Sequence, residues 1–271
     1  MDKLHFLTAG IPSIAKDYTN AFDILNDMNL DGLEVEFVHG VRYSPKTREA
    51  ILNRGDKIIT HHGPYYINLN AKEEDKKQAS IKRVLDTARA GKDLGAYSIT
   101  YHAAFYLGNN SETVTKNMID IHKEIVDILQ KEDNNIWIRP ETTGKNSQWG
   151  TLEEIVELSK HFTQVLPCVD FAHIHARNNG TYNTYDEFSK ILEYIGQNLG
   201  DVALNNFHAH VAGIEYSQKG EKKHLIFEEA DFNYKDLLKA FKKFNIKGTI
   251  TCESPNIEID TKILKDYYTS L

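Results

Sequence analysis

The residues of this sequence that could do chemistry lie at the ends of short apolar runs. One run, residues 165–169, leads directly into Asp170, and His173 follows three positions later. Apolar strands more often pass into Gly, Pro, Asn or Ser, so a carboxylate followed by an imidazole is an unusual ending. Imidazole nitrogens and carboxylate oxygens are ligands that zinc accepts in proteins. The stretch therefore indicates a metal site.

The same residue types recur at or near the ends of other apolar runs. These further candidates are His62, His102, Glu141, His208, His224 and Glu253. A single histidine or carboxylate at such a place is more often an ordinary hydrogen-bonded residue or a helix cap, and that alternative stays open for each of them. The coincidence over six consecutive runs favours one shared site.

Several carboxylates and imidazoles at close range would perturb one another's ionisation. Two or three divalent cations would balance these charges, and a carboxylate that bridges two cations offsets their mutual repulsion. The imidazole-rich set favours zinc, with manganese as the alternative, over magnesium, which prefers oxygen ligands. We therefore expect two to three Zn²⁺ per chain.

Further histidines lie beside these candidates. His210 shares a strand face with His208 and is expected to support it from outside the ligand set. His175 is left open between such a supporting position and the solvent-exposed surface. The others show no comparable placement and are expected to be structural; they are His5, His39, His122 and His161.

Eight short strands are predicted, each bounded by turn residues or by a helical pattern. They cover residues 4–9, 32–37, 57–62, 97–102, 136–141, 165–170, 205–211 and 247–253. Amphipathic helical patterns fill the gaps between most of them. Gly95 is expected to end one helix, Ser111 to cap the next, and Thr151 with Glu154 to form a capping box.

Strands that alternate with helices predict parallel pairing, and eight such units close into a (β/α)8 barrel. The rival fold, a doubly wound open sheet, predicts a glycine-rich phosphate loop after an early strand. The first loop contains a lone Gly10 and no GxGxxG pattern. We therefore expect an α/β TIM barrel that spans residues 1–271 as one domain. Its metal site is expected at the C-terminal ends of the strands.

The composition restricts the class of protein further. The formal net charge is -7 over 271 residues, so a strongly basic nucleic-acid surface is absent overall, although a local basic groove is not excluded. The two cysteines, Cys168 and Cys252, lie inside apolar runs and do not suggest a disulfide framework. The sequence shows no signal-peptide pattern and no membrane-spanning run. We expect a cytoplasmic monomer without a membrane partner.

Seven stretches between residues 61 and 256 resemble endonuclease IV, most of all an archaeal-type branch of that family. They are, in order, HHGPYYINLN, YHAAFYLG, RPETTGK, CVDFAHIHAR, FHAHVAGIEYS, KGEKKH and TCESPN. The more specific elements are His-x-x-Tyr-x-x-Asn-Leu from His62 and Asp-x-x-His from Asp170. The family comprises zinc-dependent apurinic/apyrimidinic endonucleases on a xylose isomerase-like TIM barrel, so the resemblance implies the same fold and activity.

The resemblance also implies three metals. The ligand sets are, in order, His62, His102 and Glu141; then Glu141, Asp170, His208 and Glu253; then His173 and His224. Family members carry an Asp two residues before the last of these histidines, where this chain has Lys222. Glu221 is the favoured substitute, and Glu228, Glu229 and Asp231 are alternatives. Without a substitute, the centre would hold two metals.

The implied reaction is hydrolysis of the phosphodiester 5′ to an abasic site in double-stranded DNA, a step of base excision repair. A metal-bridged hydroxide would attack the phosphorus, with Glu141 as the bridging ligand and Glu253 orienting or deprotonating the water. The abasic nucleotide would leave the helix stack to reach the barrel mouth. Substrate contacts are expected from Tyr65, Asn68, Arg42, Lys145 and Arg177; for the last three, an ordinary solvated charge is an equal alternative.

A second function remains open, that of a metal-dependent sugar isomerase or epimerase on the same barrel. Such an enzyme needs one constellation of the type Glu141, Asp170, His208 and Glu253. It has no need of the additional imidazoles, which favour the nuclease, whereas the acidic composition favours the sugar enzyme. A binding barrel without catalysis is the least favoured, because so many ligand types on one rim are costly to retain without metal.

Overall fold

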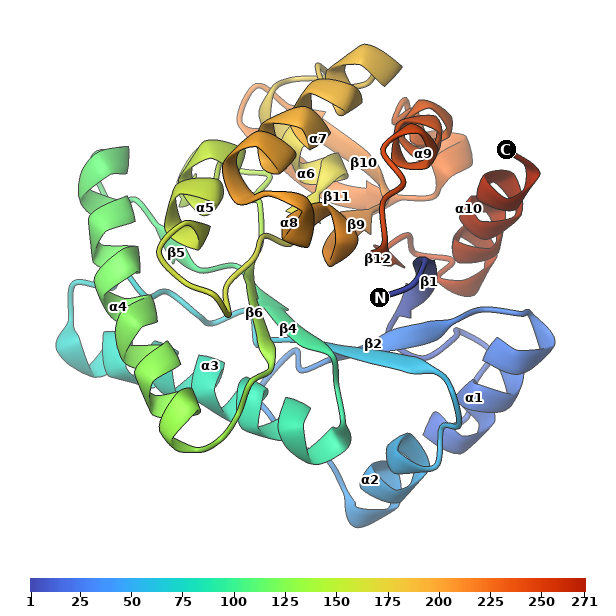
Figure 1. Cartoon of the computed structure of the whole chain (residues 1–271), viewed down its shortest axis with the longest axis horizontal. Helices are drawn as coiled ribbons and strands as arrows, with labels where there is room; N and C mark the ends of the chain where they lie inside the picture. Colours follow the sequence, from blue (N-terminus) through green and yellow to red (C-terminus); the bar gives the residue numbers. More distant parts are fainter.

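The computed structural model describes residues 1–271, and its centre is a sheet of eight parallel strands (Figure 1). The strands are β1 (Leu4–Ala9), β2 (Gly32–Glu36), β3 (Ile58–His62), β4 (Ser98–Tyr101), β6 (Trp137–Pro140), β8 (Val169–Asp170), β9 (Phe207–Val211) and β12 (Gly248–Cys252). All eight predicted strands are confirmed, and each bound lies within four residues of the expected one. The sixth is shortest, because the predicted residues before Val169 make only isolated bridges, at Val165 and Cys168.

The strand order β6-β4-β3-β2-β1-β12-β9-β8 is that of a barrel cut open between β6 and β8. Two parallel bridges, Ile138 to Val165 and Glu141 to Cys168, join β6 to the segment that leads into β8. These bridges close the ring, so the predicted TIM barrel is confirmed.

Helices surround the sheet on its outer side (Figure 1). They are α1 (Tyr18–Asp27), α2 (Pro45–Leu52), α3 (Glu74–Leu94), α4 (Ser111–Lys131), α5 (Leu152–Ser159), α6 (Phe171–Arg177), α7 (Tyr185–Leu199), α8 (Asp201–Asn205), α9 (Tyr234–Lys243) and α10 (Glu258–Ser270), with the 3₁₀ turn η1 (Phe227–Glu229). None of them is long and apolar enough to cross a bilayer.

Two of the three predicted helix ends are confirmed. The capping box of Thr151 and Glu154 is present at α5, and Gly95 ends α3 in the left-handed conformation that favours glycine. Ser111 was the wrong cap for α4. The preceding Asn110 accepts the hydrogen bond from the Thr113 N–H, because it retains the extended backbone that a cap needs, whereas Ser111 is already helical.

The apolar core lies mainly between the sheet and the helices. Its largest cluster has 25 buried residues, including Phe171, Phe188, Phe207 and Phe241. The barrel interior is different, because polar side chains occupy much of it near the C-terminal strand ends. Two small hairpins stand beyond those ends: β5 (Ala104–Phe105) with β7 (Gln148–Trp149), and β10 (Gly213–Ser217) with β11 (Gly220–Leu225). The rigid barrel and these hairpins position the candidate site.

Candidate metal centre

Three overlapping groups of ligand-type side chains lie at the C-terminal ends of the strands. The first is His62, His102 and Glu141; the second is Glu141, Asp170, His210 and Glu253; the third is Asp170, His173 and His224. Within each group, one ligand atom per residue lies within 4.8 Å of the others. Glu141 belongs to two groups, as does Asp170, so the three groups form one continuous centre.

The first group surrounds Glu141, which follows the last residue of β6. His62 Nε2 lies 3.2 Å from Glu141 Oε2, and His102 Nε2 lies 3.2 Å from Glu141 Oε1. His62 ends β3 and His102 follows β4, so neighbouring parallel strands deliver all three side chains to one edge of the barrel. Both carboxylate oxygens therefore face imidazole nitrogens, as a bridging ligand requires.

The second group adds β9 and β12. His210 Nδ1 lies 3.5 Å from Glu141 Oε1 and 3.4 Å from Glu253 Oε1. Asp170 ends β8, and Glu253 directly follows β12. Three carboxylates and one imidazole are thus collected from four strands, a donor set suited to zinc or manganese.

Asp170 has two tasks that use different oxygens. Its Oδ1 accepts a 2.7 Å hydrogen bond from the His173 N–H and so caps α6. Its Oδ2 is buried without a hydrogen-bond partner and lies 3.2 Å from His173 Nδ1. The cap explains the Asp-x-x-His spacing, because it places the histidine in the first turn of the helix, beside the third group.

Lys222 lies two residues before His224, where family members carry an Asp. A β-bulge in the hairpin compensates for this difference, because it brings Glu221 to the same face as His224. Glu215 pairs with Lys223 and Tyr216 with Glu221, which leaves Lys222 as the extra residue. Residues three apart on a regular strand point to opposite faces, but one bulged residue restores the same face. Accordingly, Glu221 Oε2 lies 3.5 Å from His173 Nε2, whereas the Lys222 ammonium pairs with Glu215.

The ring tautomers suit metal binding. Nδ1 of His62 lies 2.7 Å from the Gly63 carbonyl, Nδ1 of His173 lies 3.0 Å from the Thr142 carbonyl, and Nδ1 of His224 lies 3.2 Å from the Glu253 carbonyl. A carbonyl only accepts, so each neutral ring holds its proton on Nδ1 and leaves the Nε2 lone pair for a ligand bond. Nε2 of His62 faces Glu141, Nε2 of His173 faces Glu221, and Nε2 of His224 has no hydrogen-bond partner. Nδ1 of His173 also lies 3.2 Å from both Glu141 Oε1 and Asp170 Oδ2.

Buried atoms without hydrogen-bond partners concentrate here. They include Glu141 Oε1, Asp170 Oδ2, His210 Nδ1 and His224 Nε2. Native structures leave few buried polar atoms unsatisfied, so a cluster of them needs an explanation. Divalent cations bound by these atoms would satisfy all four together, and the donor set therefore fits a multinuclear zinc or manganese centre.

The pKa values of the centre also indicate that its carboxylates need positive charge nearby. Burial raises the pKa of Glu253 to about 8, helped by Glu141 and Asp170 and opposed by His210. Burial alone would also raise the pKa of Glu141, but His102 and His210 lower it well below its usual value. Burial lowers the pKa of a histidine, yet carboxylates hold the pKa of His173 well above 6.5. Protonated imidazoles thus neutralise the buried carboxylates in the metal-free protein, and bound cations would take over this role.

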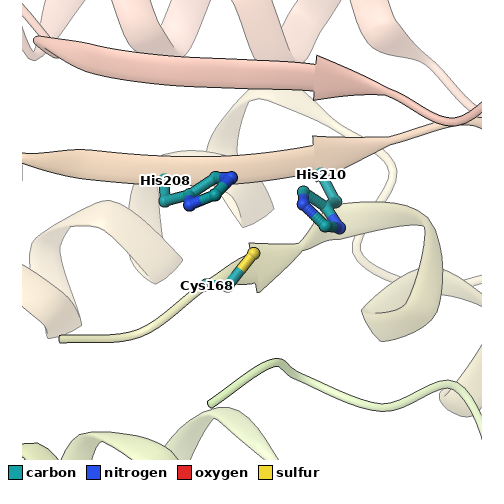
Figure 2. A group of neighbouring side chains, drawn as sticks. All are labelled: Cys168, His208 and His210. Atoms are coloured by element: carbon teal, nitrogen blue, oxygen red, sulfur yellow. The ribbon is translucent and has the colours of Figure 1, made fainter. Parts of the chain in front are cut away.

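His208 was placed wrongly in the second group, and His210 takes that position. The strand β9 runs from Phe207 to Val211, so His208 lies two residues, roughly 7 Å, farther from the C-terminal edge than His210 does. Its Nδ1 lies 3.2 Å from Ser98 Oγ, and its Nε2 lies 3.2 Å from Glu34 Oε2. Figure 2 shows His208 and His210 beside Cys168 from the neighbouring segment.

Two of the expected substrate contacts have other tasks. Arg177 Nη1 donates to the carbonyls of Thr143, Lys145 and Gln148 and so fixes the loop after β6. A contact of Arg177 with phosphate stays a prediction. Asn68 Oδ1 accepts from the backbone N–H groups of Asn70 and Phe105, which ties two loops together. The sequence showed the charge and the amide but not these backbone partners.

The other expected contacts remain accessible. Arg42 and Lys145 are exposed, and Lys145 bridges Gly220 at the tip of the β10-β11 hairpin. The Tyr65 side chain is 63% exposed, and its ring centre lies 6.0 Å from that of His62. His175, by contrast, is buried and lies 3.1 Å from Asp231, outside the three groups.

Two carboxylates of β2 were missed. Glu34 is fully buried, and it forms with Glu36 and Glu253 another group of ligand type. Burial raises the pKa of Glu36 to about 7, opposed by His62. The signal was present in GLEVEF, where two glutamates two residues apart must point to the same face of a buried strand.

The family model of the xylose isomerase-like TIM barrel matches residues 22–267, so the chain belongs to that family and the resemblance drawn from its motifs is confirmed. An uncharacterized protein of Methanocaldococcus jannaschii is 42% identical over 270 residues, 99% of this chain and 98% of that protein. An apurinic-apyrimidinic endonuclease of Caenorhabditis elegans is 28% identical over 156 residues, 56% of this chain and 37% of that protein.

Solved structures with this fold include both kinds of enzyme. A D-tagatose 3-epimerase-like protein superposes with a TM-score of 0.74 at 22% identity, over 97% of both chains. Endonuclease IV from Thermus thermophilus gives 0.72 at 15% identity, over 98% of this chain and 100% of that one. The IolI protein with a bound zinc atom gives 0.71 at 14% identity, over 98% and 96%. At these identities the likeness shows the fold alone.

Proposed function

We propose that this protein is a zinc-dependent apurinic/apyrimidinic endonuclease that cleaves DNA on the 5′ side of an abasic site. The observation that carries the proposal is the set of imidazoles beyond the second group. His62, His173 and His224 each place Nδ1 against a backbone carbonyl and direct Nε2 to the centre. An enzyme with one cation in the second group has no use for three further histidines prepared in this way.

The position of each residue in the centre indicates its role in hydrolysis. Bound cations would supply Lewis acidity at the phosphate and lower the pKa of a water molecule. Glu141 and Asp170 would hold neighbouring cations at a fixed spacing, since each belongs to two groups. Glu253 lies at the edge of the second group, and its carboxylate beside the bound cations would orient the attacking water and take up its proton.

The surroundings of the centre suit a nucleic acid. Tyr65 and Tyr66 are 63% and 60% exposed on the loop after β3, where aromatic rings would stack on a base or fill the gap at an abasic site. Lys145 and Lys219 are exposed at the tip of the β10-β11 hairpin, which carries Glu221, and would contact phosphates. The Caenorhabditis elegans relative, named as an apurinic-apyrimidinic endonuclease, supports the same substrate.

The second candidate is a sugar epimerase. It is favoured by the completeness of the second group, whose four residues alone could hold one cation against a sugar's hydroxyl and carbonyl oxygens. The epimerase-like structure also superposes as well as endonuclease IV does. The first and third groups, which this function leaves without a task, are why we prefer the nuclease.

A nicking assay separates the two functions. Zinc-saturated protein is incubated with a duplex that contains one tetrahydrofuran abasic analogue, with the intact duplex as substrate control and Glu141→Gln as enzyme control. We expect one cut, 5′ to the analogue, by the unsubstituted protein only. Absence of cutting with zinc or manganese, together with interconversion of keto sugars, would establish the epimerase instead.

A further inference from the structure

Glu34 is a fully buried carboxylate of β2 that belongs to none of the three ligand groups. Two strands, β1 and β12, separate β2 from β9 in the sheet, so any contact between Glu34 and β9 crosses the barrel interior. Glu34 Oε1 lies 2.8 Å from His210 Nε2, and Glu34 Oε2 lies 3.2 Å from His208 Nε2. One carboxylate therefore lies against both imidazoles of β9, at contact distances whose geometry falls outside that of a hydrogen bond.

The two ring nitrogens of His210 face different partners. Nδ1 faces Glu141 and Glu253 in the second group, and Nε2 faces Glu34. A metal-bound imidazole directs its second nitrogen, as N–H, to a carboxylate, carbonyl or water, and this partner sets the tautomer and the ring orientation. We infer that Glu34 is a positioning residue that holds His210 with its proton on Nε2 and its Nδ1 lone pair toward the second group.

Glu34 is itself held in place. Thr60 Oγ1 donates a 2.7 Å hydrogen bond to Oε2, and His208 approaches the same oxygen while Ser98 fixes the other side of its ring. This arrangement explains His208: it supports the carboxylate that orients His210.

The competing interpretation is a buried cation held by Cys168, His208 and His210, whose ligand atoms lie within 4.8 Å of one another (Figure 2). The distances favour Glu34 as the partner of the histidines, because their Nε2 atoms lie at 2.8 and 3.2 Å from its oxygens.

The inference rests on the proposed metal centre and holds for either substrate, so it is tested by metal binding. The variant is Glu34→Gln, which keeps the shape and removes the charge. The matched control is Asp31→Asn at the start of the same strand, whose carboxylate accepts from the Phe6 N–H and pairs with Lys265, outside the ligand groups. Competition with a chromophoric chelator should show one zinc ion weakened about 10- to 100-fold in Glu34→Gln and none in the control.

Two spectroscopic readouts complete the test and need no substrate. In zinc-saturated, ¹⁵N-histidine-labelled protein, His210 should carry its proton on Nε2, and that signal should shift in Glu34→Gln. A proton on Nδ1, or unchanged zinc affinity in folded Glu34→Gln, would overturn the inference. So would a cysteinate-to-cobalt charge-transfer band that disappears in Cys168→Ser. If abasic DNA is not cut but the affinity difference appears, the nuclease proposal fails and this inference stands.

Discussion

Replacing Glu221 by Gln is expected to weaken one of three cations selectively. Glu221 Oε2 lies 3.5 Å from His173 Nε2, and its side chain is only 17% exposed, so its charge acts on the third group with little screening by water. Loss of a carboxylate that merely supports a metal ligand costs about 10- to 100-fold in affinity. A direct ligand should reach at least the upper figure, about 2.8 kcal/mol.

Lys222 provides the matched controls, because it is the neighbouring residue of the same hairpin. Its ammonium pairs with Glu215, away from His173, as the bulge requires. Lys222→Ala and Lys222→Asp should therefore leave all three zinc affinities unchanged. The assay is a competition titration of zinc-saturated protein against a chromophoric chelator, read as the number and affinity of bound ions.

Two results would refute this reasoning. If Glu221→Gln kept the third cation at its original affinity, Glu221 would not be the replacement for the missing aspartate. If Lys222→Asp bound the third cation more tightly than the unsubstituted protein does, position 222 would face the centre. The bulge would then not direct that side chain away.

The remaining predictions concern three other buried positions. Glu141→Gln should abolish activity and release more than one cation, since Glu141 belongs to two groups; loss of a single cation in elemental analysis would argue against bridging. Gly144→Ala should loosen the third cation about tenfold or more by chelator titration, because a Cβ there would lie 2.7 Å from Glu221 Oε2; unchanged affinity would argue against that crowding. Burial lowers the pKa of His122 to about 4, so the unfolded chain binds a proton first as the pH falls below 6.5, and stability is lost between 6.5 and 4. In urea unfolding of metal-free protein, the free energy of unfolding should fall between pH 7 and pH 5 by about 2 kcal/mol less in His122→Gln than in the unsubstituted protein. An equal fall in both proteins would refute this.

The fold was predictable because its signals are local and repeated. Each strand is a short β-rich run, and the alternation with helices selects a parallel barrel whatever the side chains at its mouth. Strand-end placement then brought His62, His102, Glu141, Asp170 and Glu253 to one rim, where the structure has them.

The errors share a cause, which is depth along a strand. His208 and His210 point to the same face, and only the exact start and end of β9 decide which one reaches the rim. Glu221 was the favoured substitute, but the bulge that turns it toward His173 was not predictable, because one unpaired residue changes which face Glu221 occupies. The structural partners of Arg177 and Asn68 could not be predicted either, because they are backbone groups distant in sequence that no local pattern reveals.

The central proposal is that this barrel holds more than one metal ion. The direct measurement is elemental analysis of the purified protein, combined with anomalous diffraction at the zinc edge to locate each ion. We predict zinc in all three groups, with Glu141 and Asp170 each between two ions and Glu221 on the third. A single ion bound by Glu141, Asp170, His210 and Glu253 would contradict a multinuclear centre and favour the epimerase.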